Sequence, residues 1–249
     1  MPRSSSSAVD KALDLIEAVA RSDRPLRLSE LADQVELHRP TAYRVLVDLV
    51  RRGWVLRAGD LYLPGAAVLR LSSGAVAHSL VALARPALEA LSSRTGLMVN
   101  LQVLESDRSR VLDVVRPQRL EMITDLLGQA LPVHRFAGPL ALVARLEQRE
   151  RDPYLRVAEQ AAQSPDEAAA LLADLAEVER TGFALERGRN EKPVASMSRA
   201  VVSAKGTPIC ALTLVGLGAD FDEPRLEQLR RDLLDAAEGL RRLLTAVDA

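Results

Sequence analysis

Apolar residues recur at helical spacing in a short segment near the N-terminus, Pro40–Arg51. They form one stripe of a 3.6-residue helix, and the stripe consists of Ala42, Val45, Leu46, Leu49 and Val50. At about 100° per residue, Arg44 and Arg51 point away from this stripe, and Thr41 and Tyr43 lie on its flanks. The pattern therefore predicts a helix with one apolar face and one arginine-bearing face.

A second short helix is predicted just before this one, joined to it by a tight turn. It is expected to begin at Ser29, a good N-cap, and to bury Leu31, Ala32 and Val35. Pro40 suits the first turn of the following helix, because its missing N–H is not needed there. Two short helices in this order favour a helix-turn-helix whose second helix enters a DNA major groove. The alternative is an ordinary helical hairpin with a solvated charged face.

The residues after the second helix favour DNA binding. Gly53 is expected to end that helix, and two short strands are predicted at Trp54–Arg57 and Leu61–Leu63, around a tight turn at residues 58–60. Such a hairpin is a wing, with Arg57 beside its tip. Leu26–Leu28 is predicted to be a further short strand that pairs with this wing.

An earlier helix is predicted to begin after Ser7 and to end near Ser22. Its expected buried face consists of Val9, Ala12, Leu13, Ile16, Val19 and Ala20. Pro64-Gly65 marks the first domain boundary, and the apolar segment Ala66–Leu83 is predicted to be helical with a weak point at Ser72-Ser73-Gly74. This segment is either a plain linker helix or one that also packs against its own copy in a dimer.

The second half of the chain changes in pattern to strands mixed with helices. Strands are predicted at Met98–Leu104, Val111–Val115, Phe183–Glu186, Val194–Val202 and Pro208–Val215. Helices are predicted at Pro86–Arg94, Gly138–Glu147, Pro165–Arg180 and from Asp222 to about Leu244. The last helix is expected to be buried at Leu226, Leu229, Leu233, Ala236, Leu240 and Leu243. The fold class is therefore α+β, with a largely antiparallel sheet and helices packed on it.

These patterns divide the chain into three parts. We expect a winged helix-turn-helix domain at residues 1–64, a linker helix at 65–83 and a C-terminal domain at 84–249. The length of 249 residues is enough for two domains with separate cores. The chain contains no run of 18 apolar residues and no secretory leader, so a cytoplasmic protein without a membrane partner is expected.

Charge and chemistry narrow the function further. The net charge is −1, but the segment Leu37–Arg57 holds five arginines against one aspartate, a local patch suited to phosphate contacts. The single cysteine, Cys210, lies in an apolar strand, and the three histidines show no metal-ligand spacing. The common nucleophile, nucleotide and zinc-protease motifs are absent from the sequence, so no enzyme, cofactor or metal site is predicted.

The chain resembles the IclR family of bacterial transcriptional regulators. The matching segments are 8–20, 25–55, 61–65, 84–96, 128–144, 180–188 and 208–216. The resemblance implies a winged helix, a helical linker and a GAF-like α/β effector domain, with operators bound by dimers or by tetramers built from two dimers. It also implies candidate base or phosphate contacts at Arg39, Thr41, Tyr43 and Arg44. Arg51, Arg52 and Arg57 are better candidates for backbone phosphates.

The family's effector pocket corresponds to seven positions of this sequence. They are Leu120, Ala137, Gly138, Glu186, Ser196, Thr213 and Val215. The helix start at Ala137 and Gly138 would attract an anion, and inward strand hydroxyls would orient it. The sequence departs from the family at Pro139-Leu140, Gly188-Arg189, Ser196 and Val215, which removes polar anchors. A larger and more apolar effector, or none, is therefore expected, and Ser196 and Thr213 can equally be core residues.

The hypothesis is a DNA-binding regulator of the IclR type that binds a near-palindromic operator as a dimer or tetramer, with affinity set by a small-molecule effector. Two alternatives stay open. One is a DNA-binding regulator whose C-terminal domain only forms oligomers. The other is a small-metabolite enzyme with a helical accessory domain.

Overall fold

The computed structural model describes residues 7–22, 24–68, 75–162 and 164–245. The chain divides into two compact units, residues 1–78 and 79–249, and each is described separately. No described helix is both long and apolar enough to cross a membrane. The predicted weak point at Ser72-Ser73-Gly74 lies outside the described residues.

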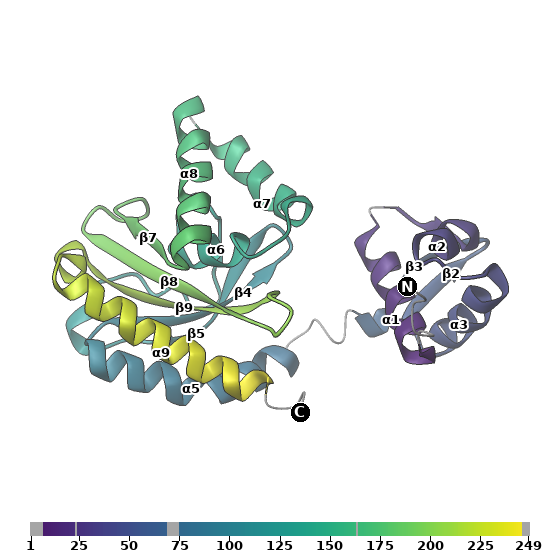
Figure 1. Cartoon of the computed structure of the whole chain (residues 1–249), viewed down its shortest axis with the longest axis horizontal. Helices are drawn as coiled ribbons and strands as arrows, with labels where there is room; N and C mark the ends of the chain where they lie inside the picture. Colours follow the sequence, from purple (N-terminus) through teal and green to yellow (C-terminus); the bar gives the residue numbers. More distant parts are fainter. Residues whose placement is uncertain (1–6, 23, 69–74, 163, 246–249) are drawn as a thin grey trace. The chain divides into compact units, whose positions relative to one another are not determined.

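The N-terminal unit is a winged helix-turn-helix (Figure 1, purple and dark blue). Its elements are α1 (Ala8–Arg21), β1 (Leu26–Arg27), α2 (Leu28–Gln34), α3 (Arg39–Arg51), β2 (Val55–Ala58) and β3 (Leu61–Pro64). The three strands form an antiparallel sheet in the order β1-β3-β2, with Leu26 opposite Tyr62 and Arg57 opposite Tyr62 on the other side. The predicted wing and the short strand that pairs with it are thus confirmed.

The buried face of α1 differs from the predicted one. Leu15 and Val19 are buried in the core of the unit, whereas Val9 and Leu13 are 65% and 51% exposed. The predicted buried face was therefore wrong in part. Helix α1 has more apolar residues than one face can hold, so the pattern alone did not show which of them face the core. The predicted cap is confirmed: the Ser7 hydroxyl accepts from the Asp10 N–H, and the Asp10 carboxylate accepts from the Ser7 N–H.

The start of α2 also differs from the prediction. The helix begins at Leu28, so Ser29 lies in its first turn and not at its N-cap. The carboxylate of Glu30 instead accepts from the backbone N–H of Arg27 at 2.7 Å and pairs with Arg24 at 2.5 Å. A carboxylate in the first turn satisfies a free N–H and complements the helix dipole.

The end of α3 is fixed to the end of the wing by two glycines. Gly53 has φ +77°, a conformation that a side chain strains, and its carbonyl accepts from the N–H of Ala67. A Cβ on Gly65 would lie only 2.2 Å from the Gly53 carbonyl oxygen. The close approach of these backbones therefore requires glycine at position 65, and it holds β3 against the C-terminus of α3.

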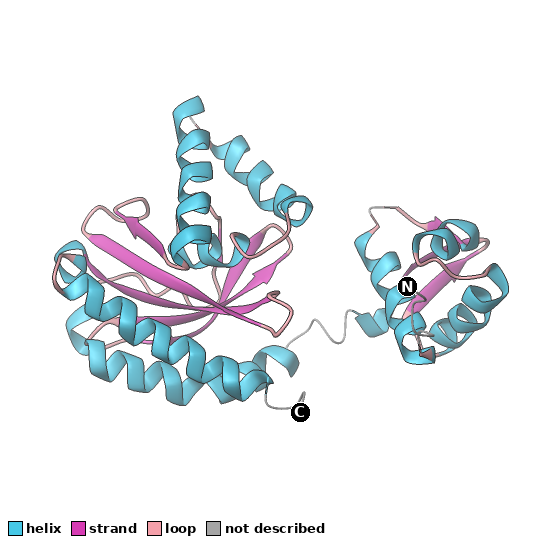
Figure 2. Cartoon of the chain, in the orientation of Figure 1, coloured by secondary structure: helices cyan, strands magenta, loops and turns pink. Residues whose placement is uncertain are grey.

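The C-terminal unit is built on one six-stranded antiparallel sheet in the order β6-β5-β4-β9-β8-β7 (Figure 2, magenta). The strands are β4 (Met98–Glu105), β5 (Arg108–Val115), β6 (Ala130–Leu131), β7 (Ala184–Arg187), β8 (Val194–Val202) and β9 (Pro208–Leu217). The helices are α5 (Ala75–Thr95), α6 (Ala137–Val143), α7 (Gln148–Ala161), α8 (Pro165–Thr181) and α9 (Arg225–Thr245), with short 3-10 turns at Gln118–Leu120 and Gly218–Phe221.

Helices cover both faces of the sheet. The long helices α5 and α9 lie along one face, and α6 lies on the other with α7 and α8 beyond it (Figure 1). The first layer packs Leu88, Leu233 and Leu240 against the strands. The second packs Leu140, Tyr154 and Leu175 together. All seven residues of α6 are buried, so the polar residues on the strands beneath it are also enclosed.

Several predicted boundaries in this unit were wrong. Helix α5 runs without interruption through Pro86, although a new helix was predicted to begin there. Leu80, Ala84, Leu88 and Leu91 all pack into one core cluster, and this burial outweighs the cost of about 3 kcal/mol of an internal proline.

Three further boundaries moved. β5 begins at Arg108, before the predicted start at Val111, and α6 ends at Val143, before the predicted end at Glu147. The helix α7 was not predicted. The last helix, α9, begins at Arg225 and not at the predicted Asp222, and Leu243, which was predicted to be buried, is 58% exposed.

Candidate DNA-binding surface and effector cavity

The outward face of α3 presents a row of exposed side chains. Ala42, Leu46 and Leu49 are buried, which turns the opposite side of the helix toward solvent. The side chains of Arg39, Arg44 and Arg52 are exposed and form no hydrogen bond or ion pair with the described residues. Tyr43 and Val47 are 43% and 45% exposed, one helical turn apart. Thr41 is half-buried. The arginine-bearing face is therefore accessible, as the sequence predicted.

Two of the predicted phosphate-contacting arginines have partners within the unit. Arg51 pairs with Asp48 at 2.8 Å, with both side chains more than 60% exposed. Arg57 donates from Nε to the carbonyl of Gly59 at 2.8 Å and lies over the ring of Tyr62. Exposed contacts of this kind contribute about 0–1 kcal/mol to stability, so a DNA phosphate can replace Asp48 as the partner of Arg51 or the Gly59 carbonyl as the partner of Arg57.

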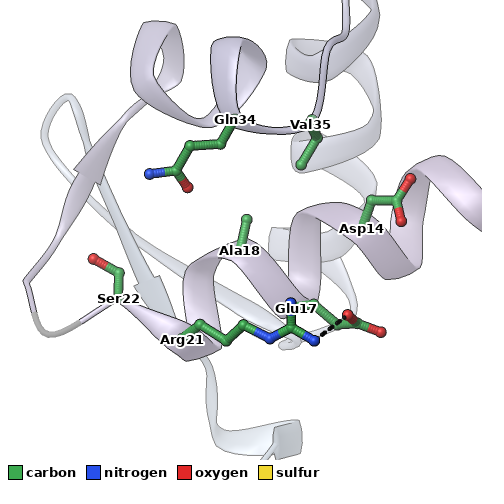
Figure 3. A pocket seen from close by; sticks show the side chains of 7 residues that line it. All are labelled: Asp14, Glu17, Ala18, Arg21, Ser22, Gln34 and Val35. Atoms are coloured by element: carbon green, nitrogen blue, oxygen red, sulfur yellow. Dashed lines mark hydrogen bonds and ion pairs between the residues drawn. The ribbon is translucent and has the colours of Figure 1, made fainter. Parts of the chain in front are cut away.

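A different surface of the same unit is acidic. A groove of about 380 Å³ runs between the C-terminal ends of α1 and α2 (Figure 3). Asp14 and Glu17 lie on one side, and Gln34 and Val35 on the other. Arg21 pairs with Glu17 at 3.0 Å and leaves Asp14 uncompensated in the groove. Carboxylates at this position would repel a phosphate backbone, so the groove does not extend the basic surface.

In the C-terminal unit, six of the seven predicted pocket residues line one cavity beneath α6. They are Ala137, Gly138, Glu186, Ser196, Thr213 and Val215. Leu120 is fully buried in the apolar cluster on the α5 and α9 side and does not line this cavity. The free space is small, about 30 Å³, which is enough for a water molecule and less than a typical ligand site of roughly 300 Å³.

A chain of buried hydrogen bonds crosses the floor of the cavity. The Ser109 hydroxyl donates to Gln102 Oε1 at 2.9 Å, and Gln102 Nε2 donates to the Thr213 hydroxyl at 3.2 Å. Thr213 in turn donates to Ser198 at 2.9 Å, and Ser198 donates to the carbonyl of Leu212. Thr213 is thus satisfied inside the protein, which matches its alternative role as a core residue.

Gln102 also sets the shape of the cavity. A Cβ on Gly138 would lie 2.0 Å from Gln102 Oε1, so the amide packs directly on the first turn of α6. Neither Gln102 nor Asn100, which also lines the cavity, was among the predicted site residues. Asn100 and Gln102 alternate along β4 with the apolar residues Val99, Leu101 and Val103. A polar residue at every second position of an apolar strand was the signal that could have identified them.

Two other candidates for chemistry, Cys210 and His134, have pKa values shifted by burial. Burial raises the pKa of the Cys210 thiol to about 12, so it stays protonated at neutral pH. Burial lowers the pKa of His134, with Arg135 as a second cause. Among the described residues, no group of three His, Cys, Asp or Glu side chains could hold a metal ion.

Two family profiles match the sequence over these same two units. The helix-turn-helix domain of IclR matches residues 8–59, and the C-terminal domain of the bacterial transcriptional regulator IclR matches residues 74–242. The chain belongs to the IclR family. It is therefore a DNA-binding transcriptional regulator with an effector-binding C-terminal domain, and the enzyme alternative is excluded because the family is not enzymatic.

Characterised relatives and solved structures extend along nearly the whole chain. The acetate operon repressor of Salmonella typhimurium is 24% identical over 239 residues, covering 93% of this chain and 87% of the repressor. The transcriptional repressor IclR of Escherichia coli is 24% identical over 242 residues, with the same coverage. The crystal structure of Thermotoga maritima IclR has a TM-score of 0.62 at 22% identity and covers 95% of this chain and 98% of its own.

Another solved IclR homologue carries a ligand. The protein from Microbacterium hydrocarbonoxydans, crystallised with 4-hydroxybenzoate, has a TM-score of 0.57 at 23% identity and covers 95% of this chain and 100% of its own. At this identity the likeness establishes the fold of an IclR regulator. The ligand is a property of that homologue.

Proposed function

We propose that this IclR regulator binds a near-palindromic operator as a dimer or tetramer and that a small molecule in the cavity beneath α6 changes its operator affinity. The observation that carries the DNA-binding part is the exposed face of α3, where Arg39 and Arg44 have no partner among the described residues. A dimer would place two copies of α3 about one DNA turn apart, or a multiple of it. Because its partner is chromosomal DNA, we place its action in the cytoplasm.

We assign base readout to the outward residues of α3 and phosphate contact to its end and the wing. Arg39 and Arg44 suit bidentate contact with guanine, while Thr41 and Tyr43 can bond base edges. The exposed methyl groups of Val47 suit contact with thymine methyls. Arg51, Arg52 and Arg57 contact phosphates, which position the protein without specifying sequence.

The direct test is an electrophoretic mobility shift with the DNA upstream of the regulator's own gene, at several salt concentrations. We expect Arg44→Ala to weaken specific binding by about 1–3 kcal/mol. The matched control is Arg51→Ala on the same helix, which we expect to weaken binding to all sequences alike and to reduce the salt slope by about 0.9.

Circular dichroism of both variants checks the fold. Because both side chains are exposed, their spectra and melting temperatures are expected to match those of the unmodified protein. An unfolded Arg44→Ala variant, or wild-type binding that does not change with salt, would contradict the assigned DNA surface.

The proposed effector acts by coupling to operator affinity, with a free energy of about 1–3 kcal/mol. Support comes from the cavity beneath α6, which gathers residues from α6 and five strands of one sheet. A mobility shift with and without a bound small molecule measures the coupling directly.

A second candidate function is supported by the small free volume of the cavity, about 30 Å³. In this candidate the C-terminal unit only forms oligomers and takes no ligand. A thermal-shift screen of metabolites separates the two, since a ligand at about 100 times its dissociation constant adds roughly 2.7 kcal/mol of stability. No response across a broad screen would favour the second candidate.

A further inference from the structure

Three arginines from different parts of the C-terminal unit line one pocket. Arg145 lies just after α6, Arg199 lies on β8, and Arg241 lies on α9. All three residues are half-buried, and the pocket has a volume of about 130 Å³. A water molecule takes roughly 30 Å³ of the liquid, so this space is large enough for a small polyatomic ion. We call it the arginine pocket.

The arginine pocket lies where β8 extends past its neighbour β7. The last residue of β8 that pairs with β7 is Ser198, whereas β8 continues to Val202. Residues 200–202 line the pocket together with Ala237 and Glu238 of α9. None of the residues that line the arginine pocket also lines the cavity beneath α6. The two are therefore separate features of the C-terminal unit.

The guanidinium groups of Arg145 and Arg199 lie side by side. A Cβ on Gly182 would lie 3.2 Å from Arg145 Nη2 and 2.4 Å from Arg199 Nη1. Neither side chain forms an ion pair with the described residues. Arg199 donates from Nη1 to the Gly182 carbonyl at 3.2 Å, and its guanidinium lies over the ring of Phe183. Two like charges this close repel each other, and partial burial strengthens the repulsion.

A single carboxylate lines the arginine pocket, and it already has a partner. The Glu238 carboxylate accepts from Arg241 Nε at 2.8 Å. The lining residues of the pocket thus include three arginines and one glutamate, a net charge of +2. Burial, and then the charge of Arg145, lowers the pKa of Arg199, while the charge of Glu238 opposes this. Because a guanidinium stays protonated in proteins, a counter-ion from outside the chain is needed to balance the excess charge.

A phosphate group matches this excess charge better than a carboxylate does. A phosphate monoester carries about −1.5 to −2 charge at pH 7 and offers three strong acceptor oxygens. The planar fork of a guanidinium donates two parallel hydrogen bonds to oxygens of this kind. A simple carboxylate carries one negative charge, so it would leave part of the positive charge of the pocket unbalanced.

We propose that the arginine pocket binds a phosphate dianion, which is either free phosphate or the phosphate group of a small metabolite. Arg145, Arg199 and Arg241 donate to its oxygens, and the ion removes the repulsion between the first two guanidinium groups. The ion thereby joins the end of α6 to β8 and α9, so its binding stabilises the C-terminal unit. This site does not depend on the proposed effector cavity beneath α6.

The test is isothermal titration calorimetry of the full-length protein in a phosphate-free buffer at constant ionic strength. The probes are inorganic phosphate, glycerol 3-phosphate and acetate. We expect at least one of the two phosphate probes to bind at least tenfold more tightly than acetate. Tighter binding of glycerol 3-phosphate would assign the pocket to a phosphorylated metabolite, and equal or tighter binding of inorganic phosphate would assign it to the free ion.

Substitutions in and outside the pocket locate the bound ion. We expect Arg145→Gln to weaken phosphate binding at least fivefold, because it removes one of two adjacent charges. Glu238→Gln removes the carboxylate of the pocket, so we expect it to strengthen phosphate binding at least threefold. Arg231→Gln is the matched control on α9, since this exposed side chain donates to Gln228 outside the pocket. Arg44→Ala is the control for phosphate binding at the DNA surface, and both controls should keep the wild-type affinity.

Three outcomes would overturn the inference. They are acetate binding as tight as that of both phosphate probes, no binding of either phosphate probe at millimolar concentration, and equal phosphate affinity in the wild type and Arg145→Gln. Should Arg145→Gln fail to fold, Glu238→Gln decides, because unfolding does not produce a gain in affinity. Analytical ultracentrifugation adds a further check. A changed oligomeric state of Arg145→Gln with unchanged phosphate affinity would assign these arginines to a contact between copies of the chain.

Discussion

The outward face of α3 and the cavity beneath α6 both carry polar side chains, but under opposite physical conditions. On α3, Arg44 is exposed, and water solvates it when no DNA is bound. In the cavity, Asn100 and Thr213 are 1% and 2% exposed, so each needs a partner inside the protein or in a ligand. The arginines of α3 therefore need no partner inside the protein, whereas each buried polar atom of the cavity that lacks a partner lowers stability.

Because of this difference, substitutions on the two surfaces are expected to affect different properties. Removing an exposed arginine of α3 is expected to change DNA affinity and not the fold. Removing a polar group of the cavity is expected to change both ligand binding and the stability of the C-terminal unit, because its neighbours lose their partners.

The largest effect is expected from a comparison of substitutions on the buried and the exposed side of α3. Leu46 is fully buried and Val47, the next residue, is 45% exposed. We expect Leu46→Ala to lower the free energy of unfolding of the N-terminal unit by about 2–5 kcal/mol, since it leaves a cavity. Fluorescence of Trp54, the only tryptophan and part of this core, measures unfolding of this unit in urea.

Val47→Ala is the matched control for this experiment. We expect it to change stability by less than about 0.5 kcal/mol, because the side chain is already in water. It should instead weaken binding at operators that carry thymine at the contacted position. Equal destabilisation by the two substitutions would show that both sides of α3 are packed, and the comparison would fail.

A middle-sized effect is expected from the cavity. Thr213→Val keeps the shape of the side chain and removes the hydroxyl that accepts from Gln102 and donates to Ser198. We expect the C-terminal unit to lose about 1–3 kcal/mol of unfolding free energy. Far-UV circular dichroism should show an earlier transition for this unit, while the Trp54 transition stays where it was. A shift of the Trp54 transition alone would contradict the assignment.

The smallest expected effect is a dependence on pH. Burial, and then the charge of Arg135, lowers the pKa of His134 below its usual value of about 6.5. The unfolded chain therefore binds the proton more readily, and the contribution of His134 to stability is complete above that value and declines as pH falls below it. Circular dichroism melts of the C-terminal unit at a series of pH values should show this loss. His134→Gln should flatten the dependence, and an unchanged slope would remove His134 as its source.

Local pattern was sufficient for α3 and the wing. The spacing of Ala42, Leu46 and Leu49 alone places Arg44 on the opposite side, because a helix repeats every 3.6 residues. The same reasoning chose the wrong buried face for α1, because this helix has apolar residues on two faces and only one of them packs into the core. It also predicted two helices where α5 is one. The cost of Pro86 is visible in the local sequence, whereas the burial that outweighs this cost depends on distant parts of the chain.

The sequence by itself determined the helix-turn-helix, the wing, the exposed arginine face and most strands, since each depends on residues close together in the chain. Only the tertiary structure decided the interior of the cavity. It brought Asn100 together with Glu186 and Thr213, which lie more than 80 residues further along the chain. It also left one acceptor unsatisfied and gave the hydroxyl of Thr213 two partners. The physical reason is that a hydrogen bond inside a protein is set by distances of a few tenths of an ångström between distant segments, and no local spacing encodes them.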